Sequence, residues 1–362
     1  MAGKDIAQLD KNFLGEEITY DGMKFHHVFD EPFKLYGFYN PYEEKAFKRL
    51  PTEVAMKLNV NVQELYKNTS GGRIRFRTDS EKILLRSIIS EITIADHMPK
   101  TGVTCFDLYI DGEYKKSFRH GSMGGLKASD VEDPNVYDSN ISLGDRKMRD
   151  ILINFPLYND IDDVFIGLES DATIEAPKEY TIQKPIVFYG SSITQGACAS
   201  HPGNAYANQL SRRFDADFIN LGFSSGGLAE IEMAEYIGNL DMSIFVYDYD
   251  HNAEEAEYLA ETHERMFKII RKMQPDLPII MASAADSMFG EIEARRNVIK
   301  TTYANAIAAG DKNVYFIDGR DIYKPVGRSL CTVDHIHPND LGFYMMANAF
   351  GDVIEKILAE RK

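Results

Sequence analysis

The alternation of apolar and polar residues divides the chain into two parts with different secondary structure. Up to about residue 175, short β-branched and aromatic runs are separated by turn residues. Residues 72–80 begin with alternating apolar and charged side chains, and residues 82–95 are rich in isoleucine. Asp111-Gly112 lies between two apolar runs, which is a strong hairpin signal. Many short strands with few helical patterns predict a β-sandwich, or jelly-roll, domain over residues 1–175.

From about Tyr180 onwards, short apolar runs alternate with longer amphipathic stretches. The short runs are typical of buried strands, and they fall at residues 186–189, 217–221, 243–248, 277–282 and 314–318. The amphipathic stretches predict helices over residues 253–273, 287–309 and 341–360. Because alternating strands and helices form parallel, doubly wound sheets, we expect a flavodoxin-like three-layer α/β/α domain over residues 180–362. The connection between the domains falls within residues 169–185, where helical periodicity is lacking.

Polar residues of the kinds that take part in catalysis follow several of the predicted parallel strands. They occupy residues 190–196, 222–227, 248–252 and 334–338. Ligands of parallel sheets bind beyond the carboxyl ends of the strands, so these segments are expected to share one edge. Acyl transfer from a serine requires a nucleophile, an imidazole base, a carboxylate and donors for an oxyanion. All four kinds of group occur in these segments, which predicts an acyl-transfer site at that edge.

Two serines compete for the role of nucleophile. Ser192 stands in the sequence YGSSITQG, directly after the first strand of the second domain. Ser224 stands in a Gly-x-Ser-x-Gly sequence formed with Gly222 and Gly226, the pattern of the α/β-hydrolase nucleophile elbow. The Ser224 interpretation leaves residues 190–196 and Asn252 without a role, so Ser192 is the favoured candidate. A serine after a strand can also serve only as a helix N-cap.

An Asp-x-x-His pair near the C-terminus supplies the base and the carboxylate. Asp334 precedes His337 by three residues. On one turn, the carboxylate can accept a hydrogen bond from one ring nitrogen while the other nitrogen faces the serine. His335 is adjacent to the aspartate and is expected to point elsewhere. Pro338 discourages helical backbone at His337 before the last helix begins.

These segments resemble those of the SGNH, or GDSL-type, hydrolases, and most closely the esterases with an N-terminal GxDLY-type β-domain. Residues 105–109 (CFDLY) and 155–158 (FPLY) are similar to that N-terminal domain, with Cys105 in the place of its glycine. The similarity is specific in the first, third and last segments of the second domain and covers most of the chain. It implies a β-sandwich followed by an SGNH catalytic domain. Ser191 stands where the family usually has an aspartate before the nucleophile.

Carried over to this chain, the resemblance implies a catalytic triad of Ser192, His337 and Asp334. It also implies an oxyanion hole with a side-chain donor from Asn252 and a backbone N–H from Ser192. A further backbone N–H comes from the second segment, where Ser225 occupies the position of the family's glycine and Gly226 follows one residue later. A serine N–H can serve there if its backbone dihedral permits.

Composition bears on the binding partners and the cellular location of the protein. The 362-residue chain has a formal net charge of −16, which argues against nucleic acid and anionic membranes and favours neutral substrates. The N-terminal residues lack the apolar core of a signal peptide, and no apolar run reaches the length of a membrane span. Three widely spaced cysteines fit a reducing compartment, and we expect a cytoplasmic protein.

The sequence offers no clear set of metal ligands. The cysteines show no zinc-binding spacing, and Asp248 and Asp250 lack partners at ligand spacing. His251 is expected to be a loop residue, and Cys198 a small packed residue rather than a reactive thiol. We therefore expect an enzyme that works without a metal or another cofactor.

The reading that unites these observations is a two-domain serine esterase. The resemblance implies short acyl groups, acetyl above all, on sugars or oligosaccharides. Three alternatives remain open: an acyltransferase with the same triad, a non-catalytic carbohydrate-binding protein, and an α/β-hydrolase that uses Ser224. The acidic, two-domain chain is compatible with a homo-oligomer.

Overall fold

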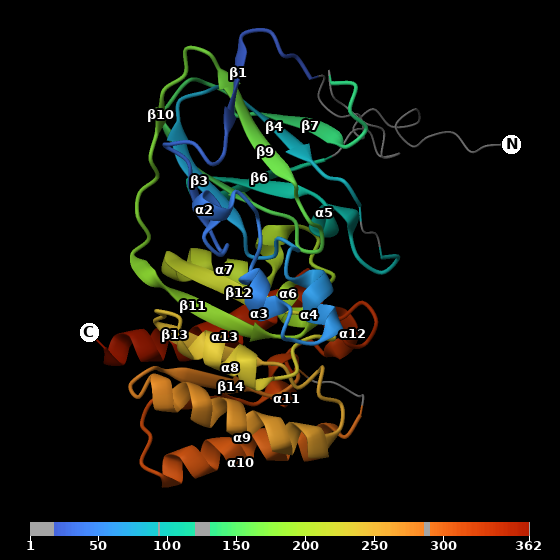
Figure 1. The fold of residues 1–362 in the computed structure, drawn as a ribbon, viewed down its shortest axis with the longest axis vertical. Helices are drawn as coiled ribbons and strands as arrows, with labels where there is room; N and C mark the ends of the chain where they lie inside the picture. Colours follow the sequence, from blue (N-terminus) through green and yellow to red (C-terminus); the bar gives the residue numbers. More distant parts are fainter. Residues whose placement is uncertain (1–17, 93–94, 120–130, 286–289, 362) are drawn as a thin grey trace, which may run out of the picture.

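The computed structural model describes residues 18–92, 95–119, 131–285 and 290–361. Two parts are stacked along the long axis of the molecule, an all-β part at one end and a sheet with helices at the other (Figure 1). The predicted fold class is thereby confirmed. The described helices are too short or too polar to cross a membrane.

The N-terminal part contains two antiparallel sheets. In order across the first sheet lie β1 (Met23–His27), β9 (Asp163–Glu169), β4 (Lys82–Ile88) and β7 (Val136–Ser142). In order across the second lie β10 (Ile174–Glu175), β3 (Arg73–Thr78), β8 (Arg149–Asn154), β5 (Phe106–Ile110) and β6 (Glu113–Phe118), with β2 (Lys34–Tyr36) also paired to β3. The inward side chains of both sheets form one core, in which Phe76, Phe106 and Ile166 are fully buried.

The predicted hairpin forms between β5 and β6. Asp111 and Gly112 at its tip both have positive φ, 51° and 89°, as a type I′ turn requires. The predicted strand over residues 82–95 is shorter than expected. It ends at Ile88, because Ser90 then bonds through its N–H and its hydroxyl to the Asp162 carboxylate instead of to a neighbouring strand. Residues 93–94 lie outside the described part of the chain.

Four short helices in this part were not predicted. Each has only four to six residues, too few to show helical periodicity: α2 (Pro41–Glu44), α3 (Thr52–Ala55), α4 (Val60–Leu65) and α5 (Lys100–Val103). Asn59 caps α4 by accepting hydrogen bonds from the N–H groups of Asn61 and Val62. Helices α3 and α4 lie against the second part of the chain rather than on the sandwich (Figure 1).

The C-terminal part is built on a five-stranded parallel sheet. In order across it lie β12 (Ala216–Gly222), β11 (Ile182–Gly190), β13 (Ile244–Asp248), β14 (Ile279–Ala282) and β15 (Val314–Ile317). The longer helices are α7 (Tyr206–Phe214), α8 (Ile231–Gly238), α9 (Ala256–Met273), α10 (Ile292–Ala308) and α13 (Asp340–Glu360). Short helices α6 (Ser192–Gln195), α11 (Gly319–Ile322), α12 (Arg328–Cys331) and a 3₁₀ turn (Pro202–Asn204) lie in the connections.

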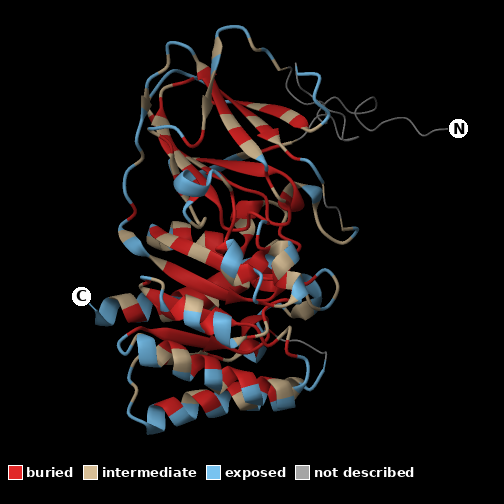
Figure 2. Ribbon diagram, viewed as in Figure 1, coloured by how far each residue is buried: buried red, intermediate tan, exposed pale blue. Residues whose placement is uncertain are grey.

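Side chains of each strand alternate between two apolar layers. Ile186 and Phe188 of β11 pack in the layer formed with α7 and α13, whereas Val187 and Tyr189 pack in the layer formed with α8, α9 and α10. Figure 2 shows the sheet buried and the outer faces of α9 and α10 exposed. This is the predicted three-layer arrangement.

Two of the predicted helices begin later than expected. Helix α9 starts at Ala256 rather than 253, because the N–H groups of Asn252 and Ala253 still bond into the loop after β13, to the carbonyls of Tyr249 and Asp250. Helix α10 starts at Ile292, and residues 286–289 of the predicted stretch lie outside the described part.

The carboxyl ends of β11, β12 and β13 leave the sheet side by side. Gly190 is paired with Gly222 on one side and with Asp248 on the other. A Cβ at Gly190 would lie 2.0 Å from the Thr194 hydroxyl and 2.5 Å from the Asp248 carbonyl, so only glycine fits this crossing point. The first three polar segments therefore meet at one edge, as the sequence predicted.

A buried arginine of the N-terminal part ties the two parts together at this edge. The Arg49 guanidinium donates to the carbonyls of Gly222, Asn68 and Leu65 at 2.5–2.7 Å. It also stacks on the ring of Phe223, 4.2 Å from its centroid. Removing such a buried, fully bonded cation leaves its carbonyl partners unpaired, so Arg49 fixes the loop that follows β12.

Candidate active site

Ser192, His337 and Asp334 form a continuous hydrogen-bonded chain beyond the end of β11. Ser192 is the first residue of α6, and Ser191 caps this helix by accepting from the Ile193 N–H. The Ser192 Oγ lies 2.9 Å from His337 Nε2. The His337 Nδ1 lies 2.7 Å from Asp334 Oδ2. The structure thus brings the three predicted side chains together in the order hydroxyl, imidazole, carboxylate.

The Asp-x-x-His segment folds around its own carboxylate. The other oxygen of Asp334, Oδ1, accepts from the N–H groups of Ile336 and His337 at 3.0 and 2.7 Å. Burial alone would raise the pKa of Asp334, but these bonds and the one from the His337 ring outweigh it and hold that pKa at about 2. His335 is exposed, at φ 71°, outside this arrangement. The carboxylate therefore stays ionised while it orients the imidazole.

The loop after β12 is organised by one carbonyl oxygen. The Phe223 carbonyl accepts from the N–H groups of Gly226 and Gly227 at 3.0 and 3.2 Å. It also accepts from the side-chain amide of Asn252 at 3.0 Å. Ser225 is exposed and has a φ of 52°, in the left-handed region where a glycine is usual. Ser225 therefore has a backbone conformation that favours glycine.

Ser224 lies apart from the imidazole chain. Its N–H donates to the Gln195 side-chain oxygen at 3.0 Å, and its side chain is hydrogen-bonded to Tyr158. The Tyr158 hydroxyl also donates to the carbonyl of Ser192 at 3.0 Å. The imidazole of His337 faces Ser192, so the geometry favours Ser192 over Ser224.

Gln195 was not singled out from the sequence, although it lies in the same segment as Ser192. Its side chain is fully buried. The amide nitrogen donates to Asn68 Oδ1 and to the Leu157 carbonyl of the N-terminal part, at 3.1 and 3.2 Å. Its amide oxygen accepts from Ser224. One side chain thus connects α6, the loop after β12 and the N-terminal part, a role that depends on contacts that the sequence does not reveal.

Asp107, from the CFDLY segment, supports the chain that follows α6. Its carboxylate accepts from Asn154 Nδ2, from His201 Nδ1 and from the Gly203 N–H at 2.6–2.7 Å. A Cβ at Gly203 would lie 2.3 Å from the Tyr109 hydroxyl. The aspartate and tyrosine of this segment therefore hold the connection between α6 and α7 in place.

His97 is a second residue that the sequence analysis missed. It lies between β4 and α5 in the N-terminal part, and its ring centroid is 5.6 Å from that of His337. The Cys198 thiol donates to the His97 carbonyl at 3.6 Å. Burial and the Asp334 carboxylate raise the pKa of Cys198 to about 12, so it stays a thiol and does not compete as a nucleophile.

Burial shifts the pKa values of ionisable side chains in the loop after β13 toward the neutral forms. Burial, Arg295 and His337 lower the pKa of His251 to about 3, so its imidazole is neutral at physiological pH. Burial raises the pKa of Asp250 to about 6, and Asp250 accepts from the Ala284 N–H at 3.0 Å. These residues support the loop that presents Asn252.

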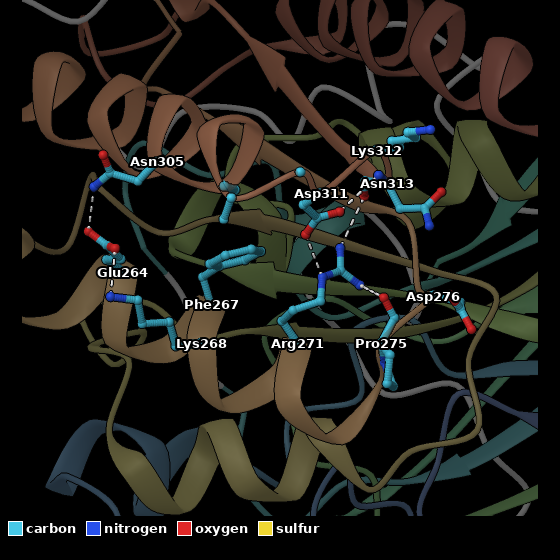
Figure 3. A pocket seen from close by; sticks show the side chains of 13 residues that line it. Glu264, Phe267, Lys268, Arg271, Pro275, Asp276, Asn305, Asp311, Lys312 and Asn313 are labelled. Atoms are coloured by element: carbon cyan, nitrogen blue, oxygen red, sulfur yellow. Dashed lines mark hydrogen bonds and ion pairs between the residues drawn. The ribbon is translucent and has the colours of Figure 1, made fainter.

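A separate surface groove lies between α9, α10 and the loops at their ends (Figure 3). It has a volume of about 540 Å³. Its arginine, Arg271, bonds to the Asp311 carboxylate at 2.7 Å and to the carbonyls of Gln274, Leu277 and Asn313. Lys268 is paired with Glu264 at 2.8 Å. These charged side chains bind the loops to one another, so their role in the groove is structural.

The sequence matches two family profiles, one for each part of the chain. Residues 23–174 match the N-terminus of SGNH-hydrolase-type esterases, termed GxDLY, and residues 183–355 match the GDSL-like lipase/acylhydrolase family. The chain belongs to the GDSL-like, or SGNH, hydrolases that carry a GxDLY-type N-terminus. Among the curated proteins, none matches the sequence.

Several solved structures share the whole two-part fold. A protein classed as a GDSL-like lipase from Bacteroides ovatus ATCC 8483 is 27% identical, with a TM-score of 0.81 over 93% of this chain and 98% of that one. The salicylyl-acyltransferase SsfX3 from a tetracycline biosynthetic pathway is 20% identical, with a TM-score of 0.74 over 93% and 98%. The acetyl xylan esterase Est2A from the rumen bacterium Butyrivibrio proteoclasticus is 14% identical, with a TM-score of 0.56 over 93% and 99%. The family is one of lipases and acylhydrolases, which are ester hydrolases, and these structures share its two-part fold.

Proposed function

We propose that this protein is a serine esterase that removes short acyl groups, acetyl in particular, from carbohydrate esters. The observation that carries the proposal is the chain from Ser192 Oγ through both nitrogens of His337 to Asp334, with distances of 2.9 and 2.7 Å. It lies at the sheet edge where the family's chemistry is expected. A hydroxyl and an imidazole at this distance can exchange a proton directly.

In this mechanism, Asp334 accepts a hydrogen bond from the Nδ1–H of His337 and thereby leaves the Nε2 lone pair facing Ser192. His337 takes the Ser192 proton as the oxygen attacks the ester carbonyl, which gives a tetrahedral intermediate. The intermediate collapses when His337 gives the proton to the departing alcohol. Water then attacks the acyl-enzyme with the same imidazole as base, and Ser192 is regenerated.

The oxyanion formed in both steps needs donors that are not already used. The Gly226 N–H donates to Phe223, so of the two candidates in this loop we propose the N–H of Ser225. The N–H of Ser192 and the side-chain amide of Asn252 complete the set. One hydrogen of the Asn252 amide is held by the Phe223 carbonyl, which leaves the other to point at the substrate.

Replacing Asn252 by alanine is expected to lower kcat by about 10²–10³-fold while the KM changes little, because oxyanion donors act mainly in the transition state. Steady-state kinetics with p-nitrophenyl acetate measure this. Asn61→Ala is the matched control. The side-chain amide of Asn61 donates to the Ser225 carbonyl, so it is not one of the proposed oxyanion donors. Equal kinetics for Asn252→Ala and wild type would remove Asn252 from the mechanism.

The shared fold and the net charge bear on the substrate class. The acetyl xylan esterase with the same fold suggests acetylated sugars, and the net charge of −16 favours a neutral substrate. The acyltransferase SsfX3, with its higher TM-score of 0.74, supports a second candidate, transfer of the acyl group to an alcohol by the same residues. Whether the acyl group passes to water or to an alcohol depends on how well water is excluded from the acyl-enzyme.

A substrate panel separates these candidates. We expect turnover of p-nitrophenyl esters to fall from acetate to butyrate to octanoate, and acetate to be released from acetylated xylo-oligosaccharides. An acyltransferase would instead form more transfer product than free acid when an alcohol acceptor is added. A preference for octanoate would contradict the short-acyl proposal, and an inert wild type that still binds oligosaccharides would favour a binding protein.

We propose a cytoplasmic location for this enzyme. Cys105, Cys198 and Cys331 are all buried and none of the three is in a disulfide bond, as is common in a reducing compartment. Self-association remains a prediction from the acidic, two-domain sequence.

A further inference from the structure

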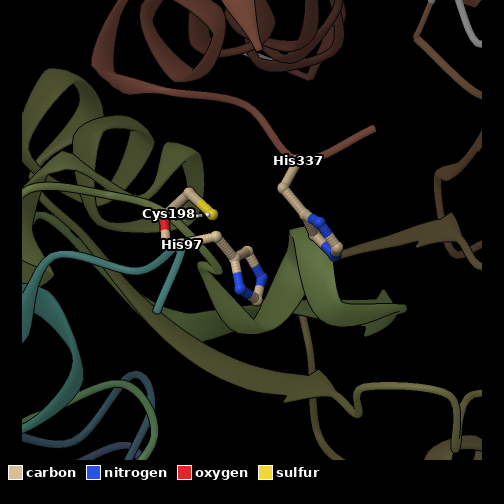
Figure 4. A group of neighbouring side chains, drawn as sticks. All are labelled: His97, Cys198 and His337. Atoms are coloured by element: carbon tan, nitrogen blue, oxygen red, sulfur yellow. Dashed lines mark hydrogen bonds between the residues drawn. The ribbon is translucent and has the colours of Figure 1, made fainter. Parts of the chain in front are cut away.

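His97, Cys198 and His337 place three metal-binding atoms in one small space (Figure 4). One ligand atom from each residue lies within 4.8 Å of the other two. The residues come from three segments: the loop between β4 and α5, the turn after α6, and the loop before α13. In Figure 4 the sulfur of Cys198 and the rings of His97 and His337 lie around a shared space. The proposed nucleophile adjoins this group, since Ser192 Oγ lies 2.9 Å from His337 Nε2.

Imidazole nitrogens and a thiolate sulfur are all zinc ligands, and zinc sites with three protein ligands keep a fourth position open. The same three groups also suit copper, so the choice between the two metals is part of the test. With bond lengths of about 2.0 Å to nitrogen and about 2.3 Å to sulfur, a tetrahedral site places its ligand atoms about 3.3–3.6 Å apart. The present arrangement, with its ligand atoms up to 4.8 Å apart, must therefore contract by up to about 1.5 Å around the ion. His97 can supply this movement because its side chain is 34% exposed. Within the described part of the chain, its ring approaches the Asp96 carboxylate at 3.4 Å and the ring of His337 at 5.6 Å between centroids.

His337 is already oriented as a metal ligand. Its Nδ1 is hydrogen-bonded to the Asp334 carboxylate, which leaves the lone pair of Nε2 available. A carboxylate behind a histidine is the usual outer partner of a zinc-bound imidazole, where it fixes the tautomer and raises the basicity of the ring. The hydrogen bond from Asp334 therefore prepares His337 both to act as a base and to bind a metal ion.

We propose that His97, Cys198 and His337 bind a zinc ion that reversibly inhibits the enzyme. The ion takes the Nε2 lone pair that otherwise accepts the proton of Ser192, so the bound form cannot start acylation. Cys198 binds as a thiolate, and its proton passes to solvent. The fourth position stays open to water or to the Ser192 hydroxyl, which lies 2.9 Å from Nε2. Harder ions such as magnesium prefer oxygen ligands and are not expected to bind.

A surface cavity reaches two of the three ligands, His97 and Cys198. It has a volume of about 400 Å³, and its lining also includes Asp96 and Asp340. These two carboxylates attract a divalent cation, and the cavity is lined by both parts of the chain. The ion would therefore also connect the N-terminal part to the proposed catalytic histidine.

Cobalt substitution tests the site without relying on activity. Cobalt(II) added to the full-length protein should give a thiolate-to-cobalt charge-transfer band and the visible bands of a tetrahedral ion. The charge-transfer band should disappear in Cys198→Ala and weaken in His97→Ala. His335→Asn is the matched control, because His335 is exposed near the same loop and asparagine tolerates its φ of 71°. A missing band in the wild type, or an unchanged band in Cys198→Ala, would overturn the proposal.

Inhibition kinetics test its consequence. Zinc should inhibit p-nitrophenyl acetate hydrolysis, and EDTA should restore it, whereas magnesium should have no effect. The inhibitory zinc concentration should rise by about tenfold or more in His97→Ala and in Cys198→Ala, since each loses one of three protein ligands. Equal zinc sensitivity in wild type, both variants and His335→Asn would contradict the site. If the protein hydrolyses no ester, the cobalt spectra still decide, so the two proposals can fail separately.

Discussion

Replacing Ser192 by alanine is expected to abolish ester hydrolysis, with kcat reduced by about 10⁴-fold or more. The substitution removes the atom that forms the acyl-enzyme and leaves the imidazole of His337 without a nucleophile to activate. Ser192 is 8% exposed and begins α6, where Ser191 supplies the cap, so alanine at 192 leaves the helix start intact. Steady-state kinetics with p-nitrophenyl acetate, with thermal unfolding to confirm folding, make the measurement.

Ser224→Ala is the matched control for this prediction. Ser224 bonds to Tyr158 and Gln195, and its loss should leave most of the hydrolytic activity. A serine-reactive phosphonate should label the wild type and Ser224→Ala, but not Ser192→Ala. Labelling of Ser224 instead, with full activity in Ser192→Ala, would show that the α/β-hydrolase interpretation of Gly-x-Ser-x-Gly is the correct one.

The sheet and the meeting of the polar segments could be predicted because they depend on local patterns. Residues 186–189 alternate between two buried layers, and such a run shows in sequence as a continuous apolar stretch. Parallel strands also place the residues that follow them at one edge, so Ser192 and Asn252 could be assigned to one region before the structure was known. The proposed catalytic residues could be predicted because parallel strands end at the same edge of the sheet.

The supporting contacts could not be predicted because they join distant residues of ordinary type. Arg49 bonds to the Gly222 carbonyl, 173 positions away, and Gln195 bonds to Asn68, 127 positions away. Nothing in the spacing of an arginine or a glutamine indicates which carbonyl it will reach. His97 has the same character, because its approach to His337 depends on how the N-terminal part sits on the sheet. These contacts explain why the β-domain lies so close to the chemistry.

Replacing Asp334 by asparagine is expected to lower kcat by about 10⁴-fold, with little change in KM. Asparagine can still accept the N–H groups of Ile336 and His337 through its oxygen, so the loop keeps its shape. Its NH₂ group, however, faces Nδ1 of His337, at the place where the wild-type carboxylate oxygen accepts a hydrogen bond. The imidazole then carries its proton on Nε2 and cannot accept one from Ser192. The loss is therefore one of tautomer and charge, not of structure.

The pH dependence separates this effect from simple acid inactivation. With its pKa at about 2, below the ordinary 3.8, Asp334 remains a carboxylate until the pH falls close to that value. The stability that its hydrogen bonds supply is present above the ordinary pKa and is lost only as pH falls through the folded value. Titration of residue 334 should consequently contribute nothing to the pH dependence of either enzyme between mildly acidic and neutral buffer. Asp340→Asn is the matched control and should keep most activity, because the Asp340 carboxylate accepts from the Ser200 N–H at 2.8 Å, away from the Asp334–His337 hydrogen bond. If Asp334→Asn retained wild-type kcat, His337 would have to be oriented by another group, and the proposed triad would reduce to a Ser–His pair.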